Sequence, residues 1–194
     1  MAVLSQVAGA VSRSLAKRGW VGLVAFMCLT AGLFGQVVSK EYQVKAVFLF
    51  NFAQFVEWPP TAFATAQTPL VIGVLGEDPF GPFLEETVQG EKIGGRELAV
   101  RRFRRIEEVD ACHLLFIGGL SNDEQEEALA ALRTRGTLTV GESESFIAQG
   151  GMIRFFTENN RIRLRINPDA AKRAGLTISS RLLRPAEIVG DGRE

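Results

Sequence analysis

One stretch near the front of the chain, residues 41–58, most restricts what this sequence can fold into. It reads EYQVKAVFLFNFAQFVEW and is followed by two prolines. Apolar residues recur in it at the spacing of one helix face, which predicts a helix. The positions that define this stripe are Val44, Val47, Phe48, Phe52, Phe55 and Val56. The residues that stay polar are Gln43, Lys45, Asn51, Gln54 and Glu57.

A helix this apolar is normally buried between other elements of a folded domain. A membrane-embedded helix is the alternative, but about 18 residues interrupted by Lys45 and Asn51 make a poor membrane span. We therefore expect a core helix, packed on strands that the rest of the chain supplies.

Residues 1–39 read as a secretory signal peptide. An apolar run over 20–35 follows a positive region that contains Arg13, Lys17 and Arg18. Val37 and Ser39 are acceptable at the −3 and −1 positions of a cleavage site after Ser39, and a cut a few residues earlier is the alternative. An uncleaved anchor is disfavoured because the run is short and no charge cluster follows it. We expect residues 40–194 to form one α/β domain that is exported to the periplasm and does not span the membrane.

The charge of the expected mature chain argues against nucleic-acid binding. Removing the three positive residues of the signal from the 22 Lys+Arg leaves 19 against 22 Asp+Glu, a net charge of −3. Nucleic-acid-binding domains usually present a net basic surface.

Only one cysteine, Cys112, remains after the signal, so the mature chain has no internal disulfide. It belongs to the apolar run CHLLFI, which is typical of a buried strand. We expect a buried, inert thiol; an intermolecular bridge is the alternative.

Apolar runs and turn formers then alternate in the pattern of βαβ units. We expect strands at 69–75, 97–103, 112–117 and 138–140, and helices at 79–88 and 121–133. Asp78 is the expected N-cap of the first of these helices, with Pro79 at its first position. Ser121 and Glu124 form a capping box at the start of the second. This order predicts a sheet that is covered by helices on both faces.

The C-terminal third changes character. Runs at 152–157 and 161–166 flank Asn159-Asn160, a dipeptide that tolerates the positive φ angles of a type I′ turn, so we expect an antiparallel hairpin. A short helix at 170–174 and a last helix at 179–189 should follow, the latter with Pro185 as a defect. The predicted fold class is α/β, a three-layer sandwich with a central mixed sheet and a C-terminal antiparallel hairpin.

Residues that could support catalysis are few. His113 is the only histidine, and it neighbours Cys112 on an expected strand, so the two side chains point to opposite faces. A zinc site would need more histidines or a Cys-x-x-Cys motif. Paired glutamates occur where solvated helix faces or loops are expected. We predict no catalytic residue, no metal site and no cofactor.

Turns at the ends of expected parallel strands are the usual ligand-binding places in α/β proteins. Residues 73–76 and Gly118-Gly119 lie at two such strand ends, and neither matches a dinucleotide fingerprint or a P-loop. A small-ligand site that uses the turns at Gly76, Glu77 and Asp78 and at residues 141–145 is one hypothesis.

A row of arginines offers a second kind of site. Arg161, Arg163 and Arg165 alternate with apolar residues, so they share one face of a strand, and Arg154 across the hairpin joins them. A solvated face balanced by carboxylates is one interpretation. A docking surface for an acidic partner is the other, because arginine pairs carboxylates bidentately and is enriched in interfaces.

Several blocks of the chain form a recognisable series: EYQVKAVFLFNFAQFVEWP, LVIGVLGEDPFG, CHLLFIG, LTVGES with a following Phe, GGMIRF, IRLRINPDAA and AGLTISSRLLRPA. In this order, over residues 41–188, they resemble the YfiR-like proteins. The resemblance implies a periplasmic, non-enzymatic protein that represses a membrane-bound diguanylate cyclase and so controls cyclic-di-GMP and biofilm formation. It also implies an α/β sandwich and a tendency to form homodimers. The cysteine pairs of some relatives cannot be carried over, because Cys112 has no partner in the mature chain.

Two function hypotheses follow. In the first, the protein is a regulatory module that docks on the periplasmic domain of an inner-membrane diguanylate cyclase or sensor kinase. In the second, it is a periplasmic small-ligand-binding protein that feeds a sensor kinase.

Overall fold

The computed structural model describes residues 39–190, so the predicted signal peptide lies outside the described residues except for Ser39. The chain divides into two compact units between residues 37 and 38, and every described residue belongs to the second. Within residues 39–190, no helix is long and apolar enough to cross a membrane.

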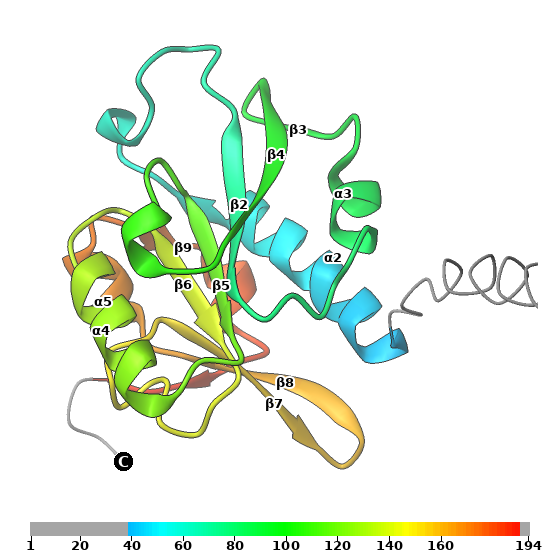
Figure 1. Cartoon of the computed structure of the whole chain (residues 1–194), viewed down its shortest axis with the longest axis vertical. Coiled ribbons are helices and arrows are strands. Elements are labelled where there is room, and N and C mark those ends of the chain that lie inside the picture. The colour runs from blue at the N-terminus through cyan, green and yellow to red at the C-terminus, as the bar shows by residue number, and fades with distance from the viewer. Residues whose placement is uncertain (1–38, 191–194) are drawn as a thin grey trace, which may run out of the picture. The chain divides into compact units, whose positions relative to one another are not determined.

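The second unit is built on an eight-stranded mixed sheet in the order β10-β8-β7-β6-β5-β2-β4-β3 (Figure 1). Its parallel centre contains β4 (Arg96–Phe103), β2 (Leu70–Gly76), β5 (Leu114–Gly118) and β6 (Leu138–Gly141). β7 (Ile153–Glu158) runs parallel to β6 and pairs antiparallel with β8 (Arg161–Ile166). The edges are β10 (Glu187–Ile188) and β3 (Lys92–Ile93), and a separate two-stranded sheet joins β1 (Val56–Glu57) to β9 (Thr177–Ile178).

Helices lie on both faces of the sheet, which confirms the three-layer prediction (Figure 1). One apolar cluster joins the sheet to α2 (Lys40–Phe55), α3 (Phe83–Val88), α5 (Pro168–Arg173) and α6 (Ser180–Leu183). The opposite cluster joins it to α4 (Asn122–Leu132). Short 3₁₀ turns, η1 (Pro60–Ala62) and η2 (Ile106–Glu108), complete the elements.

The alternation of strand side chains divides the core between these two layers. In β2, Ile72 and Val74 face the α2 side, whereas Val71 and Leu75 face the α4 side. Gly73 lies between them, where an added Cβ would meet the Cys112 Sγ at 2.7 Å. Glycine is therefore required for the close approach of the residues that precede β5.

The predicted hairpin and capping box are both confirmed. Asn159 and Asn160 have φ angles of 50° and 58°, as a type I′ turn requires, and they connect β7 to β8. Ser121 and Glu124 cap each other's backbone at the start of α4. In both cases the signal is local, because the residues that make the contact are neighbours in sequence.

The first helix is shorter than predicted. α2 ends at Phe55, and residues 56–57 form β1 instead. The Ser179 N–H donates to the Phe55 carbonyl at 2.8 Å and so satisfies a group at the helix end. Trp58 precedes a proline, which disfavours helical geometry at that position.

The burial of α2 also differs from the predicted stripe. Val44 and Val47 are 46% and 45% exposed, while Lys45 is only 4% exposed. The row that packs on the sheet contains Ala46, Leu49, Phe52 and Ala53. Two alanines in this row let the helix approach the strands closely, and Lys45 is buried because two glutamates meet its ammonium group.

Two other helices were predicted too long. α3 begins at Phe83, because Asp78 does not cap a helix: its Oδ1 accepts from the N–H groups of Phe80 and Gly81 at 2.8 and 3.3 Å. The last helix covers only Ser180–Leu183, and β10 follows where helix was expected. Pro185 explains the stop, since proline removes a backbone donor and clashes with the preceding turn.

Candidate functional site

The four arginines that the sequence singled out lie on one face of the β7–β8 hairpin. Phe155 stacks against Phe52 of α2 with ring centroids 5.6 Å apart, so its neighbours Arg154 and Phe156 point to the other side of the sheet. The register places Arg154 opposite Arg165 and Phe156 opposite Arg163. We call the surface made by Arg154, Phe156, Arg161, Arg163 and Arg165 the arginine face.

Phe156 lies at the centre of the arginine face. The guanidinium carbons of Arg154 and Arg165 lie 5.9 and 5.2 Å from its ring centroid, within cation–π range. Arg165 donates from Nε and Nη2 to the Glu187 carboxylate at 3.0 and 2.8 Å. These contacts offset the repulsion between Arg154 and Arg165, two like charges placed directly opposite each other.

Much of this positive charge remains accessible. The Arg163 side chain is 45% exposed, and its contact with Glu158 is loose at 3.7 Å. Arg161 is exposed at the start of β8, and no ion pair engages it within residues 39–190. Arg154 donates from Nε to the Glu142 carbonyl at 3.2 Å, which leaves the rest of its guanidinium for other contacts. The face is therefore ordered at its centre and basic around it.

The predicted ligand turn is tightly packed. The Glu77 N–H donates to the Gly118 carbonyl at 2.9 Å, and an added Cβ on Gly119 would lie 2.5 Å from the Glu77 Cβ. Asp78 is held by Arg102, whose Nε donates to Oδ2 at 2.6 Å. Gly76, Glu77 and Asp78 thus connect the ends of β2 and β5 to Arg102 of β4.

A crevice of about 170 Å³ opens beside that turn, on the α4 side of the sheet. Its lining is apolar at the floor and charged at the rim: Leu75, Arg104, Arg105, Ile106, Glu107, Leu120, Glu124 and Glu127. It lies where β2 is flanked by β4 on one side and β5 on the other, the switch point of a parallel sheet. The sequence did not point to this crevice, because most of its residues follow β4 or belong to α4.

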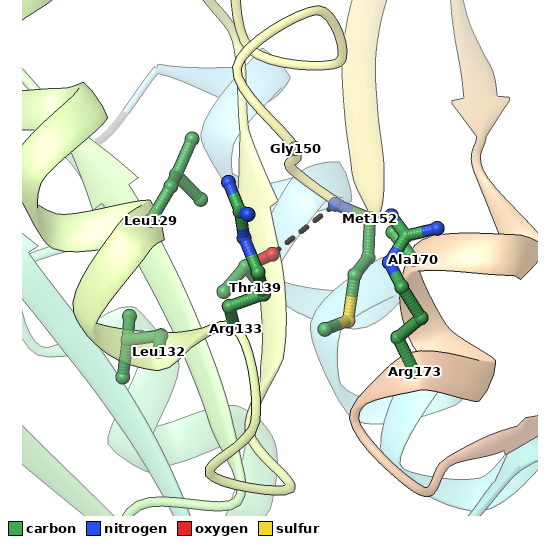
Figure 2. A pocket seen from close by; sticks show the side chains of 8 residues that line it. All are labelled: Leu129, Leu132, Arg133, Thr139, Gly150, Met152, Ala170 and Arg173. Atoms are coloured by element: carbon green, nitrogen blue, oxygen red, sulfur yellow. Dashed lines mark hydrogen bonds between the residues drawn. The ribbon is translucent and has the colours of Figure 1, made fainter. Parts of the chain in front are cut away.

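A second hollow lies between α4, β6 and α5 (Figure 2). Figure 2 shows the hydrogen bond from the Met152 N–H to the Thr139 hydroxyl, 3.1 Å long, beside Arg133 and Arg173. The cavity volume is only about 10 Å³, room for about one water molecule. This hollow is too small for an organic ligand.

His113 is a structural residue. Its Nδ1 accepts from the Val71 N–H at 3.0 Å, so the proton is on Nε2, which donates to the Ala62 carbonyl at 3.1 Å. The Phe63 ring stacks on the imidazole with centroids 4.4 Å apart. Burial lowers the pKa of His113, and the charge of Arg96 adds to the effect, against the opposing hydrogen bond to Ala62. The ring is therefore neutral at pH 7 and anchors the segment between β1 and β2.

Cys112 is buried, as predicted, and within the described residues its thiol is free. Its Sγ contacts the Leu114 carbonyl at 3.1 Å, and it packs on the α4 side of the sheet while His113 packs on the other. Burial raises the pKa of Cys112 to about 12, so the thiol stays protonated and unreactive. In the part of the chain that the structure describes, no three His, Cys, Asp or Glu residues group closely enough to hold a metal ion.

A charge cluster lies at the start of α2, and no sequence pattern indicated that Glu142 belongs to it. The Lys45 Nζ lies 2.5 Å from the Glu41 Oε1 and 2.6 Å from the Glu142 Oε1. The Tyr42 hydroxyl donates to the Glu142 Oε2 at 3.1 Å. Burial, and after it the charge of Glu142, raise the pKa of Tyr42 to about 12. The cluster ties α2 to the loop that follows β6.

Comparison with known families identifies the chain. A family model described as YfiR/HmsC-like matches residues 42–187. The chain belongs to this family. The YfiR/HmsC-like family is a family of regulatory proteins and not a known enzyme family. No curated protein matches the chain.

The match confirms the resemblance seen in the sequence, over nearly the same residues. It begins in the first turn of α2 and ends at the first residue of β10, so it includes the arginine face and all of the mixed sheet except Ile188. The YfiR/HmsC-like assignment therefore applies to nearly the entire folded unit.

Proposed function

We propose that this YfiR/HmsC-like protein is an exported, non-enzymatic regulator. It docks with its arginine face on the periplasmic domain of a membrane-bound diguanylate cyclase, or of a similar membrane sensor, and represses it. The observation that carries the proposal is the gathering of four arginines around Phe156 on the sheet face turned away from α2.

The chemistry of this face supports binding to an acidic protein surface. Arginine guanidiniums pair carboxylates in bidentate geometry, and arginine with aromatic residues is enriched at the centres of interfaces. Phe156 supplies apolar area, while Arg161 and Arg163 supply accessible charge at the far end of the hairpin. Elsewhere, His113 and Cys112 are held in structural contacts, which favours action by binding over catalysis.

The test is a binding measurement on the full-length chain, expressed and recovered from the periplasmic fraction. Its partner is the periplasmic domain of the cyclase or sensor kinase encoded beside it. We expect the triple variant Arg161→Glu, Arg163→Glu, Arg165→Glu to weaken binding about a hundredfold, since charge reversal at an interface costs both association rate and affinity. Binding of the unaltered chain should also weaken as salt increases.

A matched control separates a docking surface from a general charge effect. The variant Arg133→Glu, Arg181→Glu, Arg184→Glu makes the same change in net charge at three exposed arginines away from the hairpin. It should bind as the unaltered chain does. Equal binding by both triple variants would disprove the arginine face as the docking site. Recovery of the protein from the cytosol alone would disprove export.

Repression requires its own measurement. Added to membranes that contain the full-length cyclase, the unaltered protein should lower cyclic-di-GMP synthesis, and the hairpin triple variant should not. A protein that binds but leaves synthesis unchanged would limit the proposal to docking.

The crevice beside β2 favours one alternative function, a small-ligand-binding protein that feeds a sensor kinase. Its volume of about 170 Å³ is enough for a small organic molecule. A thermal-shift screen with amino acids, nucleotides and vitamins tests this, since a ligand that binds only the folded state raises Tm. A flat screen would count against the alternative and leave the docking proposal untouched.

A further inference from the structure

The mixed sheet is only partly covered at its β4 border. β4 lies outside β2, with only the short β3 beyond it (Figure 1). β3 pairs with β4 at Arg96 and Glu97 alone. From Leu98 to Phe103, β4 pairs with β2 on one side, and within residues 39–190 no backbone hydrogen bond joins it to any other segment. Alternate N–H and C=O groups of these residues are therefore unpaired, and we call residues 98–103 the open edge.

The first half of the open edge has none of the usual protection. Natural proteins protect exposed strand edges with charged residues, prolines or bulges. Arg101 and Arg102 place charges in the second half. Leu98, Ala99 and Val100 form an uncharged, half-buried first half. An unprotected edge of this kind is a template on which another strand can pair.

A groove of about 400 Å³ lies beside this first half, between β4 and α3. Leu98 and Val100 contribute to it from β4, because residues two apart on a strand face the same side of the sheet. The remaining lining residues come from α3 and its two ends: Pro82, Glu85, Glu86, Val88 and Gln89. A strand added at the open edge would place every second side chain over this groove.

The charge of the groove is negative. Arg102 pairs with both Asp78 and Glu85, so it neutralises only one of these two carboxylates. Glu86 is exposed, and within residues 39–190 no ion pair engages its carboxylate. Three carboxylates against one guanidinium leave a net charge of −2. The groove therefore attracts a cationic side chain.

We propose that the open edge is a docking site for an extended, basic peptide segment of another protein, which adds a strand to the sheet beside β4. Alternate side chains of the segment lie over the groove, where the apolar ones contact Leu98 and Val100 and a lysine or arginine pairs with Glu86. In strand addition, main-chain hydrogen bonds give affinity and pockets for alternate side chains give specificity.

The negative charge disfavours two other occupants. An acidic segment would be repelled by Glu86. A second copy of this chain, paired edge to edge about a two-fold axis, would bring two negative grooves to the same side of the joined sheet.

The open edge is separate from the arginine face. β2, β5 and β6 lie between β4 and the β7–β8 hairpin, so both surfaces can be occupied at the same time. The inference does not rest on the proposed function, and each can fail without the other.

The test measures binding of fluorescein-labelled ten-residue peptides to the full-length chain by fluorescence anisotropy. In each peptide, threonine alternates with three apolar residues and two lysines, and the apolar residue is valine, leucine, isoleucine or phenylalanine. We expect at least one member to bind, and its counterpart with glutamate in place of lysine to bind at least about tenfold more weakly.

Methylation of the peptide's backbone nitrogens separates strand addition from binding by side chains alone. A strand directs alternate N–H groups to one neighbour. Methylation of one alternate set should therefore abolish binding, and methylation of the other set should preserve it. Hydrogen exchange should locate the bound peptide, as slower exchange of the backbone N–H groups in residues 96–104.

Two variants test the groove itself. Glu86→Lys should weaken binding about tenfold, because it repels the peptide's lysines. The matched control is Glu126→Lys, the same charge change on an exposed position of α4, and it should bind as the unaltered chain does. Val100→Lys places a charge in the unprotected half and should also weaken binding at least about tenfold. Glu86→Lys decides the matter if Val100→Lys does not fold, because Glu86 lies at the surface.

Four results would overturn the inference. The first is no binding by any peptide of the set up to about 1 mM. The second is equal binding of the two methylated forms, and the third is equal binding by Glu86→Lys and Glu126→Lys. The fourth is protection of residues 96–104 without peptide that is lost on dilution, which would assign the open edge to a second copy of the chain.

Discussion

The outer side of α2, where Val44 and Val47 are exposed, and the arginine face lie on opposite sides of one sheet, and they differ in whether their charged side chains are exposed or buried. The hairpin turns four arginines outward around a phenylalanine. In α2, Lys45 is buried, whereas Val44 and Val47 are exposed. Exposed arginines attract the carboxylates of a partner, whereas an uncharged apolar surface interacts with other apolar surfaces.

The difference also shows why one face was predictable and the other was not. A strand alternates its side chains with a period of two, so the arginine row is visible in sequence as soon as the strand is recognised. A helix with apolar residues nearly all round has no single preferred inner side. The side of the helix that faces the core depends on contacts with distant residues. One of these is Glu142, which lies 100 residues after Tyr42 in the sequence and accepts a hydrogen bond from the Tyr42 hydroxyl.

The largest expected effect is a loss of stability, and it is measured by comparing two phenylalanines that lie on opposite faces of the β7–β8 hairpin. Phe52 is fully buried between α2 and the sheet, and Phe156 is half-buried on the arginine face. We expect Phe52→Ala to lower the free energy of unfolding by about 4 kcal/mol and Phe156→Ala by about 1 kcal/mol. Urea denaturation measures both. Equal losses would show that the arginine face is part of the core and not a surface.

The next largest effect is also a loss of stability, and it is measured by comparing two ion pairs. The Lys45 side chain is 6% exposed, and the Glu142 Oε1 is buried with only this ion pair to compensate its charge. We expect Lys45→Met to cost about 3 kcal/mol, because it leaves a carboxylate without its cation in a site that is mostly buried. Arg165→Met breaks a pair whose side chains are 36% and 39% exposed, and it should cost about 1 kcal/mol or less.

A double variant sharpens that comparison. Lys45→Met combined with Glu142→Leu removes both charges, so much of the lost stability should return. Additive losses in the double variant would mean that the two side chains act separately and that the cluster does not orient α2.

The smallest effect is the pH dependence that His113 gives to the α2 side. Because the folded-state pKa of His113 is lowered, the unfolded chain takes up its proton first, near pH 6.5. The stability that neutral His113 contributes is complete above that pH and is lost as pH falls, with a slope of at most about 1.4 kcal/mol per pH unit. Denaturation between pH 7.5 and 5.5 measures it.

That pH range lies above the titration of Glu85 and Glu124, whose pKa values are lowered by Arg102 and by Ser121. The control is His113→Gln, which should show a flatter stability profile over the same range even if it is less stable throughout. An identical slope in both proteins would contradict the neutral, buried imidazole. The arginine face should contribute no slope here, since arginine stays charged.

Local signals in the sequence were sufficient for most of the fold. The strands at 70–76 and 114–118, the hairpin turn at Asn159-Asn160 and the Ser121 cap were all predicted to within a few residues. Element ends were less predictable where a distant group decides them. Asp78 was expected to cap a helix at 79–88, and only the structure shows that its Oδ1 accepts from a short turn while Arg102 holds its Oδ2. α2 ends where Ser179 supplies a donor.

The sequence by itself determined the fold class, the family and the side of the hairpin on which the arginines lie. Those features follow from periodicity and from turn and cap residues that act on their neighbours. Only the tertiary structure decided that Lys45 is buried, that Val44 and Val47 face outward, and that His113 is locked between Val71 and Ala62. Each of these features depends on a contact with a residue that is distant in the sequence, and no local sequence pattern specifies which distant residue makes that contact.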